Sequence, residues 1–78
     1  MIQLITTMVT PLVDNTEAIR IVEEDQGDRI VYKLSVAKED MGKVIGKGGR
    51  TAKALRTLVH ATAKSKNEDK SITLDIVD

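Results

Sequence analysis

The 78-residue sequence has no cysteine, tryptophan or phenylalanine, and only one tyrosine, one histidine and one proline. Without cysteine it can form no disulfide framework, thiolate zinc site or thiol nucleophile. Its one histidine, His60, has no second histidine or cysteine with which to bind a metal, so we expect no metal and no cofactor. Tyr32 alone cannot build the aromatic platform on which several nucleic-acid-binding folds stack bases.

Long apolar runs are missing too. No stretch approaches the roughly 20 residues of a membrane span, and the N-terminus lacks the basic region and cleavage site of a signal peptide. We therefore expect no membrane contact and a reducing cytoplasm. The length allows one domain, residues 1–78, and the 41% apolar content suits a packed core.

The formal net charge is zero, but it is unevenly divided along the chain. Residues 1–42 hold four basic and eight acidic side chains, residues 43–70 hold eight basic and two acidic, and residues 71–78 hold two acidic. A basic block between acidic ones can concentrate a positive field on one face. On charge alone, an ordinary solvated helix face is the favoured interpretation of this block.

In the first half of the chain, helical spacing of apolar residues predicts a helix near residues 2–13, which Pro11 should kink or end early. The expected buried stripe of this helix comprises Ile2, Ile5, Met8, Val9 and Leu12. Alternating and β-branched residues predict strands over 18–23 and 30–36, joined by a turn over 25–28.

In the second half, Met41, Val44 and Ile45 predict a short helix, with Glu39 and Asp40 in its first turn. A longer helix should run from Thr51 to about Ala63, followed by a charged loop over 65–70 and a strand over 72–76. The side chains of the longer helix that we expect to face inward are Ala52, Leu55, Leu58, Val59 and Thr62. The order of elements predicts an α+β fold, α-β-β-α-α-β, in which helices cover one face of a three-stranded sheet.

Other polar residues suggest no chemistry of their own. The acidic pairs Glu23-Glu24, Glu39-Asp40 and Glu68-Asp69 lack calcium-binding spacing, and we interpret them as solvated or capping charge. No serine is set beside a base as hydrolysis would require, so we do not expect an enzyme.

The segment Gly46–Gly49, here called the glycine loop, places three glycines between two predicted helices. Glycine inside a helix costs roughly 1 kcal/mol relative to alanine, so bare backbone must serve a purpose here. It permits positive φ angles and close approach of another chain, and the helix beginning near Arg50 points free amides at the loop. With Lys47 at its tip, the loop resembles a site for phosphate groups.

Better-known phosphate motifs do not fit this loop. A P-loop needs four residues between its first glycine and Gly-Lys-Ser/Thr, whereas only three residues separate Gly42 from Gly46, and Gly48 replaces the hydroxyl residue. A dinucleotide fingerprint would need glycine at Thr51 and a parallel βαβ unit. A plain tight turn between helices remains an alternative, although such a corner usually needs one glycine.

The run from Val44 to Ala52, containing Gly46-Lys47-Gly48-Gly49, resembles the signature of KH domains, whose GXXG loop clamps backbone nucleotides between two helices. The element order is similar to the type II form of this fold. Ala37 to Leu58 and the ending Leu74 to Asp78 resemble the small single-KH bacterial proteins of the KhpA-like group. One departure is Ala52, where many KH domains carry isoleucine, which implies a shallower groove floor and weaker base discrimination.

The resemblance implies non-catalytic binding of single-stranded RNA in the cytoplasm, in a post-transcriptional regulator or RNA chaperone connected with cell elongation and division. It also implies a homodimer or a heterodimer with a KhpB/Jag-like KH protein, for which the apolar stripe of the first helix is one available surface. Carried over by position, the RNA-binding residues are Gly46, Lys47, Gly48 and Gly49, flanked by Lys43, Arg50 and Lys53, with Val44 and Ile45 lining a base-facing groove. Val44 and Ile45 fit an ordinary core equally well. The alternative function is a protein-interaction adaptor for which RNA binding is secondary.

Overall fold

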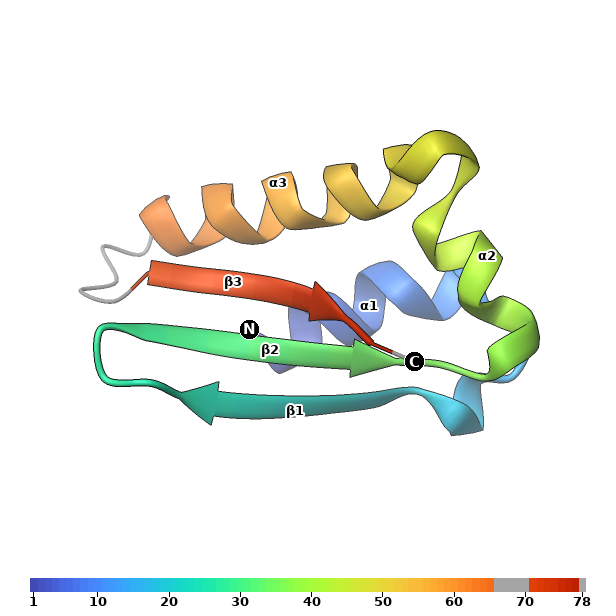
Figure 1. Ribbon diagram of the computed structural model, residues 1–78, viewed down its shortest axis with the longest axis horizontal. Helices are drawn as coiled ribbons and strands as arrows, with labels where there is room; N and C mark the ends of the chain where they lie inside the picture. The colour runs from blue at the N-terminus through green and yellow to red at the C-terminus, as the bar shows by residue number, and fades with distance from the viewer. Residues whose placement is uncertain (66–70, 78) are drawn as a thin grey trace.

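The computed structural model describes residues 1–65 and 71–77, so most of the predicted loop over 65–70 lies outside the described residues. Its helices and strands are α1 (Ile2–Val9), β1 (Arg20–Asp25), β2 (Arg29–Ser35), α2 (Met41–Ile45), α3 (Arg50–Ser65) and β3 (Ser71–Ile76) (Figure 1). This order confirms the predicted α-β-β-α-α-β arrangement and the α+β class.

The three strands form one sheet in the order β1-β2-β3. β1 and β2 are antiparallel, with Glu23 opposite Tyr32, whereas β2 and β3 are parallel, with Tyr32 opposite Leu74. The hydroxyl of Tyr32 donates a hydrogen bond to Glu23 Oε1 at 2.8 Å, so the one aromatic ring is buried in the sheet with its polar end paired. Since β2 is central, β1 and β3 are the edge strands.

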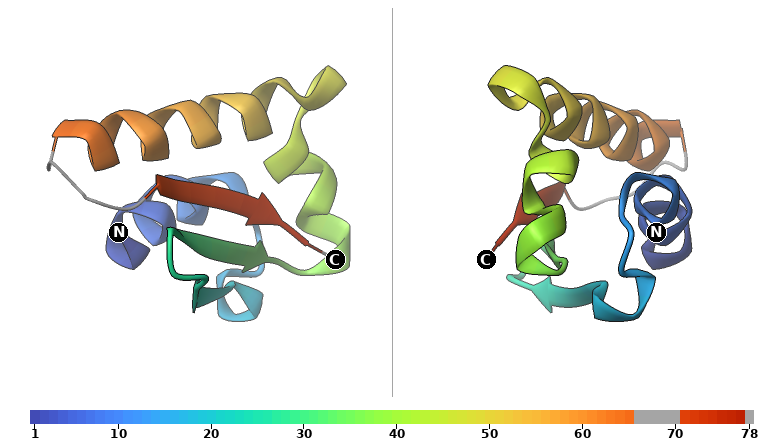
Figure 2. Two further views of the ribbon diagram at one scale, coloured as in Figure 1. Left: turned by 60° about the vertical axis from the view of Figure 1, so that its left-hand side comes forward. Right: turned by 90° about the vertical axis from the view of Figure 1, so that its right-hand side faces the viewer.

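α1 and α3 pack on the same face of the sheet, and α2 lies at the end where the chain leaves β2 (Figure 2). Alternation along β2 and β3 points one row of apolar side chains at these helices. The buried core comprises Ile5, Val9, Val13, Tyr32, Leu34, Val44, Leu55, Val59, Ala63, Ile72 and Leu74. Val44 therefore ties α2 to the same core as the long helix.

The first half of the chain confirms the early end predicted for its helix at Pro11 and departs from the prediction at Ile2 and at the start of β1. α1 ends at Val9, and Pro11 lies in a following 3₁₀ turn, because proline cannot donate the next helical hydrogen bond. Ile2, predicted to be buried, is 42% exposed. β1 begins at Arg20 rather than 18, because Thr16–Ala18 forms a second 3₁₀ turn.

Leu58 was wrongly predicted to face inward. It is 52% exposed, while the buried positions of α3 are Ala52, Leu55, Val59 and Ala63. Successive helical residues are rotated by about 100° around the helix axis. The buried residues of α3 are three or four positions apart, and Leu58 lies at the edge of the surface that they form. The sequence pattern alone could not choose between two adjacent rows of apolar residues.

Candidate nucleic-acid interface

The glycine loop links α2 to α3 and contains a 3₁₀ turn over its last three residues. The amide of Gly49 donates to the carbonyl oxygen of Gly46 at 3.1 Å, and the amide of Gly46 donates to that of Gly42 at 2.9 Å. These two bonds close the turn and end α2. Lys47 and Gly48 lie at the exposed tip, where we expect their amides to be the donors that an approaching anion meets.

Backbone geometry explains why glycine is needed at the start of this loop. Gly46 has φ 77° and ψ 172°, a region that is essentially reserved for glycine. A Cβ atom there would lie 2.7 Å from Thr51 Cβ and 2.9 Å from the Thr51 amide nitrogen. Gly46 therefore permits the close approach of α2 to the first turn of α3, which no other residue allows.

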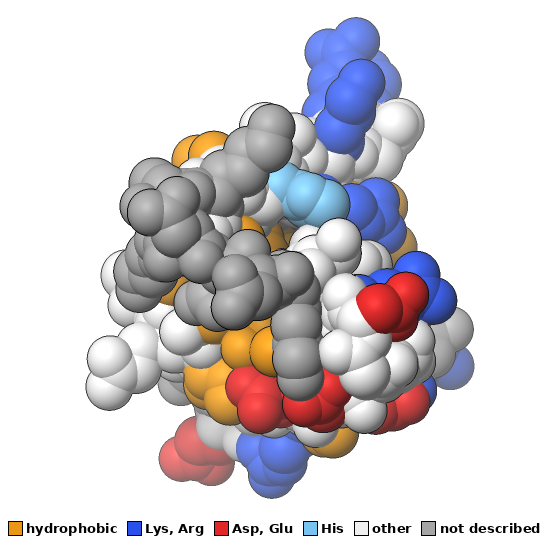
Figure 3. All heavy atoms as spheres, turned by 90° about the vertical axis from the view of Figure 1, so that its left-hand side faces the viewer, with side chains coloured by type: hydrophobic (Ala, Val, Ile, Leu, Met, Phe, Trp, Pro, Cys, Tyr) orange, Lys and Arg blue, Asp and Glu red, His pale blue; other side chains and the backbone are white. Residues whose placement is uncertain are grey.

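Three of the predicted cationic residues lie in the glycine loop or just after it. Lys47, Arg50 and Lys53 are all exposed, and the first turn of α3 contains no acidic residue to oppose them. The charged side chains that rise highest in Figure 3, on the α3 side, are basic, whereas acidic side chains gather in the lower half, on the β1 side. The unequal charge of the sequence blocks thus becomes an unequal charge of the surface.

The two predicted groove residues differ in their surroundings. Val44 is fully buried in the core, whereas Ile45 is 40% exposed. Ala52, on the first turn of α3, is 4% exposed. Of the two residues, Ile45 thus has apolar surface available to a ligand, while Val44 supports α2 from below.

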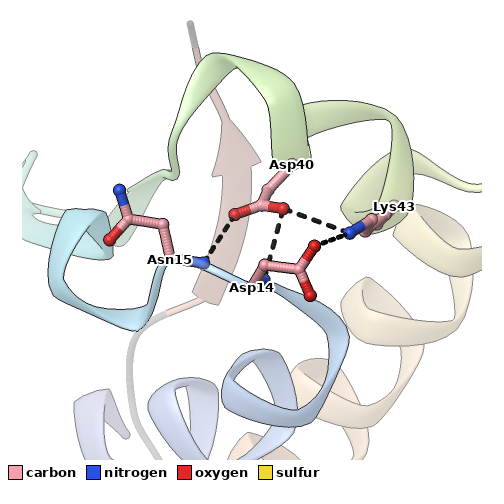
Figure 4. A network of polar contacts seen from close by, with 4 residues as sticks. All are labelled: Asp14, Asn15, Asp40 and Lys43. Atoms are coloured by element: carbon pink, nitrogen blue, oxygen red, sulfur yellow. Dashed lines mark hydrogen bonds and ion pairs between the residues drawn. The ribbon is translucent and has the colours of Figure 1, made fainter.

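Lys43 is surrounded differently from the other three cations. Its ammonium pairs with the carboxylate of Asp14 and lies 3.4 Å from Asp40 Oδ1, in a cluster of Asp14, Asn15, Asp40 and Lys43, here called the Asp40 cluster (Figure 4). The side chain points back toward the N-terminal end of α2, and the glycine loop follows the C-terminal end. The structure therefore brings Lys43 to two carboxylates.

Asp40 corrects the interpretation of its acidic pair as solvated or capping charge. Its side chain is 1% exposed and accepts hydrogen bonds from the backbone amides of Asp14, 3.2 Å, and Asn15, 3.0 Å. It lies in a 3₁₀ turn, Lys38–Asp40, immediately before α2. Its bonds join α2 to a segment 25 and 26 residues earlier, which local sequence patterns do not reveal.

Asp40 and Lys43 both stay ionised at neutral pH. The amide of Asn15 is the main cause that lowers the pKa of Asp40 below 3.8, helped by the Asp14 amide and Lys43 and opposed by burial. The Asp14 carboxylate is the main cause that raises the pKa of Lys43. Because the pKa of Asp40 falls on folding, its stabilising effect is present above the ordinary value and is lost as the pH drops through the folded one.

Arg56, an exposed residue of α3, makes a contact that its position in the sequence does not reveal. Its Nε donates to the carbonyl oxygen of Leu74 at 3.3 Å. This bond joins α3 to the edge strand β3, so the arginine lies where the helix meets the open side of the sheet. Only the three-dimensional fold brings these two residues together.

The structure was also compared with the requirements of a metal site and of a membrane-spanning helix. Within residues 1–65 and 71–77, no group of three or more His, Cys, Asp or Glu side chains could hold a metal ion. Across the same ranges, the helices lack the combination of length and apolar character that crossing a membrane requires.

Comparison with known proteins agrees with the sequence resemblance. The family described as KhpA/KhpB, KH domain, matches residues 2–76. "RNA-binding protein KhpA" of Listeria monocytogenes serovar 1/2a is 55% identical over 76 residues, covering 97% of each chain. The protein of the same name from Bacillus subtilis strain 168 is 48% identical over 75 residues, covering 96% of this chain and 90% of the relative. That of Chlamydia pneumoniae is 50% identical over 60 residues, 77% of each chain.

Proposed function

Since the chain belongs to the KhpA/KhpB KH-domain family, we propose that it binds single-stranded RNA without catalysis, as one KH domain that holds the sugar-phosphate backbone at the glycine loop. The observation that supports this most directly is the exposed tip of Lys47 and Gly48. It presents a lysine and bare backbone directly before the N-terminus of a sixteen-residue helix. Amides, a lysine and a helix N-terminus together attract phosphate oxygens.

The residues around the loop take different parts in this proposal. Gly46 and Gly49 shape the turn, and the amides of Lys47 and Gly48 face the phosphates. Arg50 and Lys53 extend the positive path along α3, and their attraction is independent of base identity. Val44 supports α2 beneath the bases, and Ile45 lies beside them. Lys43, the remaining residue predicted for the site, has its ammonium at Asp14 and Asp40.

Base selectivity should be low. The bases would meet the exposed side chain of Ile45, which can neither donate nor accept the hydrogen bonds that distinguish bases, while Ala52 is nearly buried. Stacking by Tyr32 is not available, since its ring is 5% exposed within the sheet. The energy of binding should therefore come mainly from the backbone of the RNA.

A small domain with few base contacts gains affinity by acting with a second one. We propose a homodimer or a heterodimer with a KhpB/Jag-like KH protein, in the cytoplasm, serving cell elongation and division as the family resemblance implies. Part of the predicted surface for pairing, the stripe of α1, packs into the core, because Ile5 and Val9 are fully buried, whereas Ile2 at its start is exposed. Among the residues whose side chains the structure describes, the large apolar ones that are exposed are Ile2, Val22, Ile45 and Leu58.

The salt dependence of RNA affinity tests the proposal. For a fluorescent single-stranded oligouridine of roughly ten nucleotides, log K should fall linearly with log salt, by about 0.7 for each phosphate contacted. Lys47→Gln should lower this slope by about one contact. Lys33→Gln is the matched control, because Lys33 lies on β2 and is paired with Glu24 at 2.9 Å. Absent binding, or affinity that ignores salt, would refute the proposed function.

A further inference from the structure

The Asp40 cluster lies at the base of α2, and the glycine loop continues from the tip of this helix. α2 has only five residues, Met41–Ile45. So short a helix is not stable by itself in water, and tertiary contacts must set its direction. Val44 provides one such contact through the core, and Asp40 provides another at the end of the helix away from the loop.

The bonds of Asp40 reach a part of the chain that does not otherwise belong to the site. Asp14 and Asn15 precede the 3₁₀ turn before β1, and both donate their backbone amides to the Asp40 carboxylate. A buried carboxylate that accepts two amides and faces an ammonium is well satisfied and holds its partners in a fixed geometry. The segment between α1 and β1 is thereby fastened to the start of α2 (Figure 4).

Lys43 completes this arrangement. Its ammonium lies between Asp14 and Asp40, one of them 85% exposed and the other buried. A lysine that leaves these two carboxylates for an RNA phosphate would exchange two anionic partners for one and leave the buried one short of a cation. Lys43 therefore gains little from phosphate binding, in contrast to Lys47 at the exposed tip.

We propose that Asp40 is a positioning residue for RNA binding, which orients α2 and the glycine loop from the base of the helix, and that Lys43 serves this cluster instead of contacting phosphate. The inference rests on the proposed function. It assigns the glycine loop a support on the opposite side of α2, so that the loop meets RNA already ordered. Preorganisation of this kind raises affinity without adding a contact to the ligand.

The expected change in RNA affinity for Asp40→Asn is opposite to the one that charge alone would cause. Removing a negative charge beside an RNA-binding site should by itself raise affinity for a polyanion. Glu39→Gln does this at an exposed neighbouring position in the same 3₁₀ turn, and it is the matched control. Asp40→Asn removes the same charge and also disrupts the cluster, so it should lower affinity instead.

The experiment measures oligouridine affinity of Asp40→Asn, Glu39→Gln and Lys43→Gln at a temperature where circular dichroism shows each variant folded. We expect about fivefold weaker binding for Asp40→Asn, as if about one fifth of the molecules held a competent loop, and unchanged or tighter binding for Glu39→Gln. Lys43→Gln should weaken binding while leaving the salt slope at its wild-type value. Its milder change keeps the test valid if Asp40→Asn does not fold.

The outcomes separate this inference from the proposed function. If the wild-type protein binds oligouridine but folded Asp40→Asn binds as tightly as Glu39→Gln, Asp40 is not a positioning residue. If Lys43→Gln lowers the salt slope as much as Lys47→Gln does, Lys43 contacts phosphate and the inference is overturned. Failure of the wild-type protein to bind any RNA would instead remove the proposed function.

Discussion

Replacing Lys47 and Gly48 together by aspartate should abolish RNA binding and leave the fold intact. Two carboxylates would then face the phosphates at the loop tip, and such like-charge juxtaposition costs several kcal/mol, or at least about 100-fold in affinity. The fold should survive because Gly48 has φ 65° and ψ 18°, a left-handed conformation that aspartate tolerates, and its Cβ would meet no atom within 4 Å. Fluorescence anisotropy with oligouridine measures the loss.

The chain offers a matched control for this double change. Lys33→Asp with Gly27→Asp makes the same change of charge at another place. Gly27 lies in the hairpin turn between β1 and β2, and like Gly48 it has a positive φ, 90°, and open space for a Cβ atom. We expect this control to keep most of its RNA affinity. Undiminished RNA binding by the loop variant would support the alternative of a protein-interaction adaptor, or place RNA on another face.

Gly46→Ala should be the most damaging single change to the glycine loop. Its Cβ would lie within 3 Å of the Thr51 Cβ and amide nitrogen, and neither atom can move without displacing the first turn of α3. Backbone strain at φ 77° adds to this clash, for a combined cost of about 2–5 kcal/mol. Urea denaturation should show the loss of stability, and RNA binding should fall with it.

Gly49→Ala separates the clash from the strain. Gly49 also has a positive φ, 78°, yet a Cβ there would meet no atom within 4 Å. It should therefore destabilise the protein less than Gly46→Ala does. Equal stability of Gly46→Ala and the wild-type protein would mean that α2 and α3 do not approach each other at Gly46 as closely as the structure indicates.

Local signals in the sequence were enough to predict most of the fold. Alternation along Ile30, Tyr32 and Leu34 identified the second strand, and the three glycines identified the junction between the last two helices. Element order then confined the fold to an α+β class. These features depend on neighbouring residues, which is why they can be predicted without knowledge of distant contacts.

The contacts that hold the candidate site in place could not be predicted in the same way. Asp40 followed by Met41 looks like an acidic residue at a helix start, and only contacts across 25 and 26 residues show that it is buried and bound to backbone amides. Leu58 was misplaced for a related reason, since its exposure depends on how α3 is rotated against the sheet. Both errors concern long-range packing, which periodicity does not encode.

The most direct test of the account is an NMR titration of the isotope-labelled protein with single-stranded oligouridine at low ionic strength. Binding at the glycine loop predicts that amide resonances of residues 43–53 shift, with the largest changes at Lys47 and Gly48, while those of the β1–β2 hairpin around Gly27 stay in place. Resonances of residues 43–53 that do not move at saturating RNA would contradict the account.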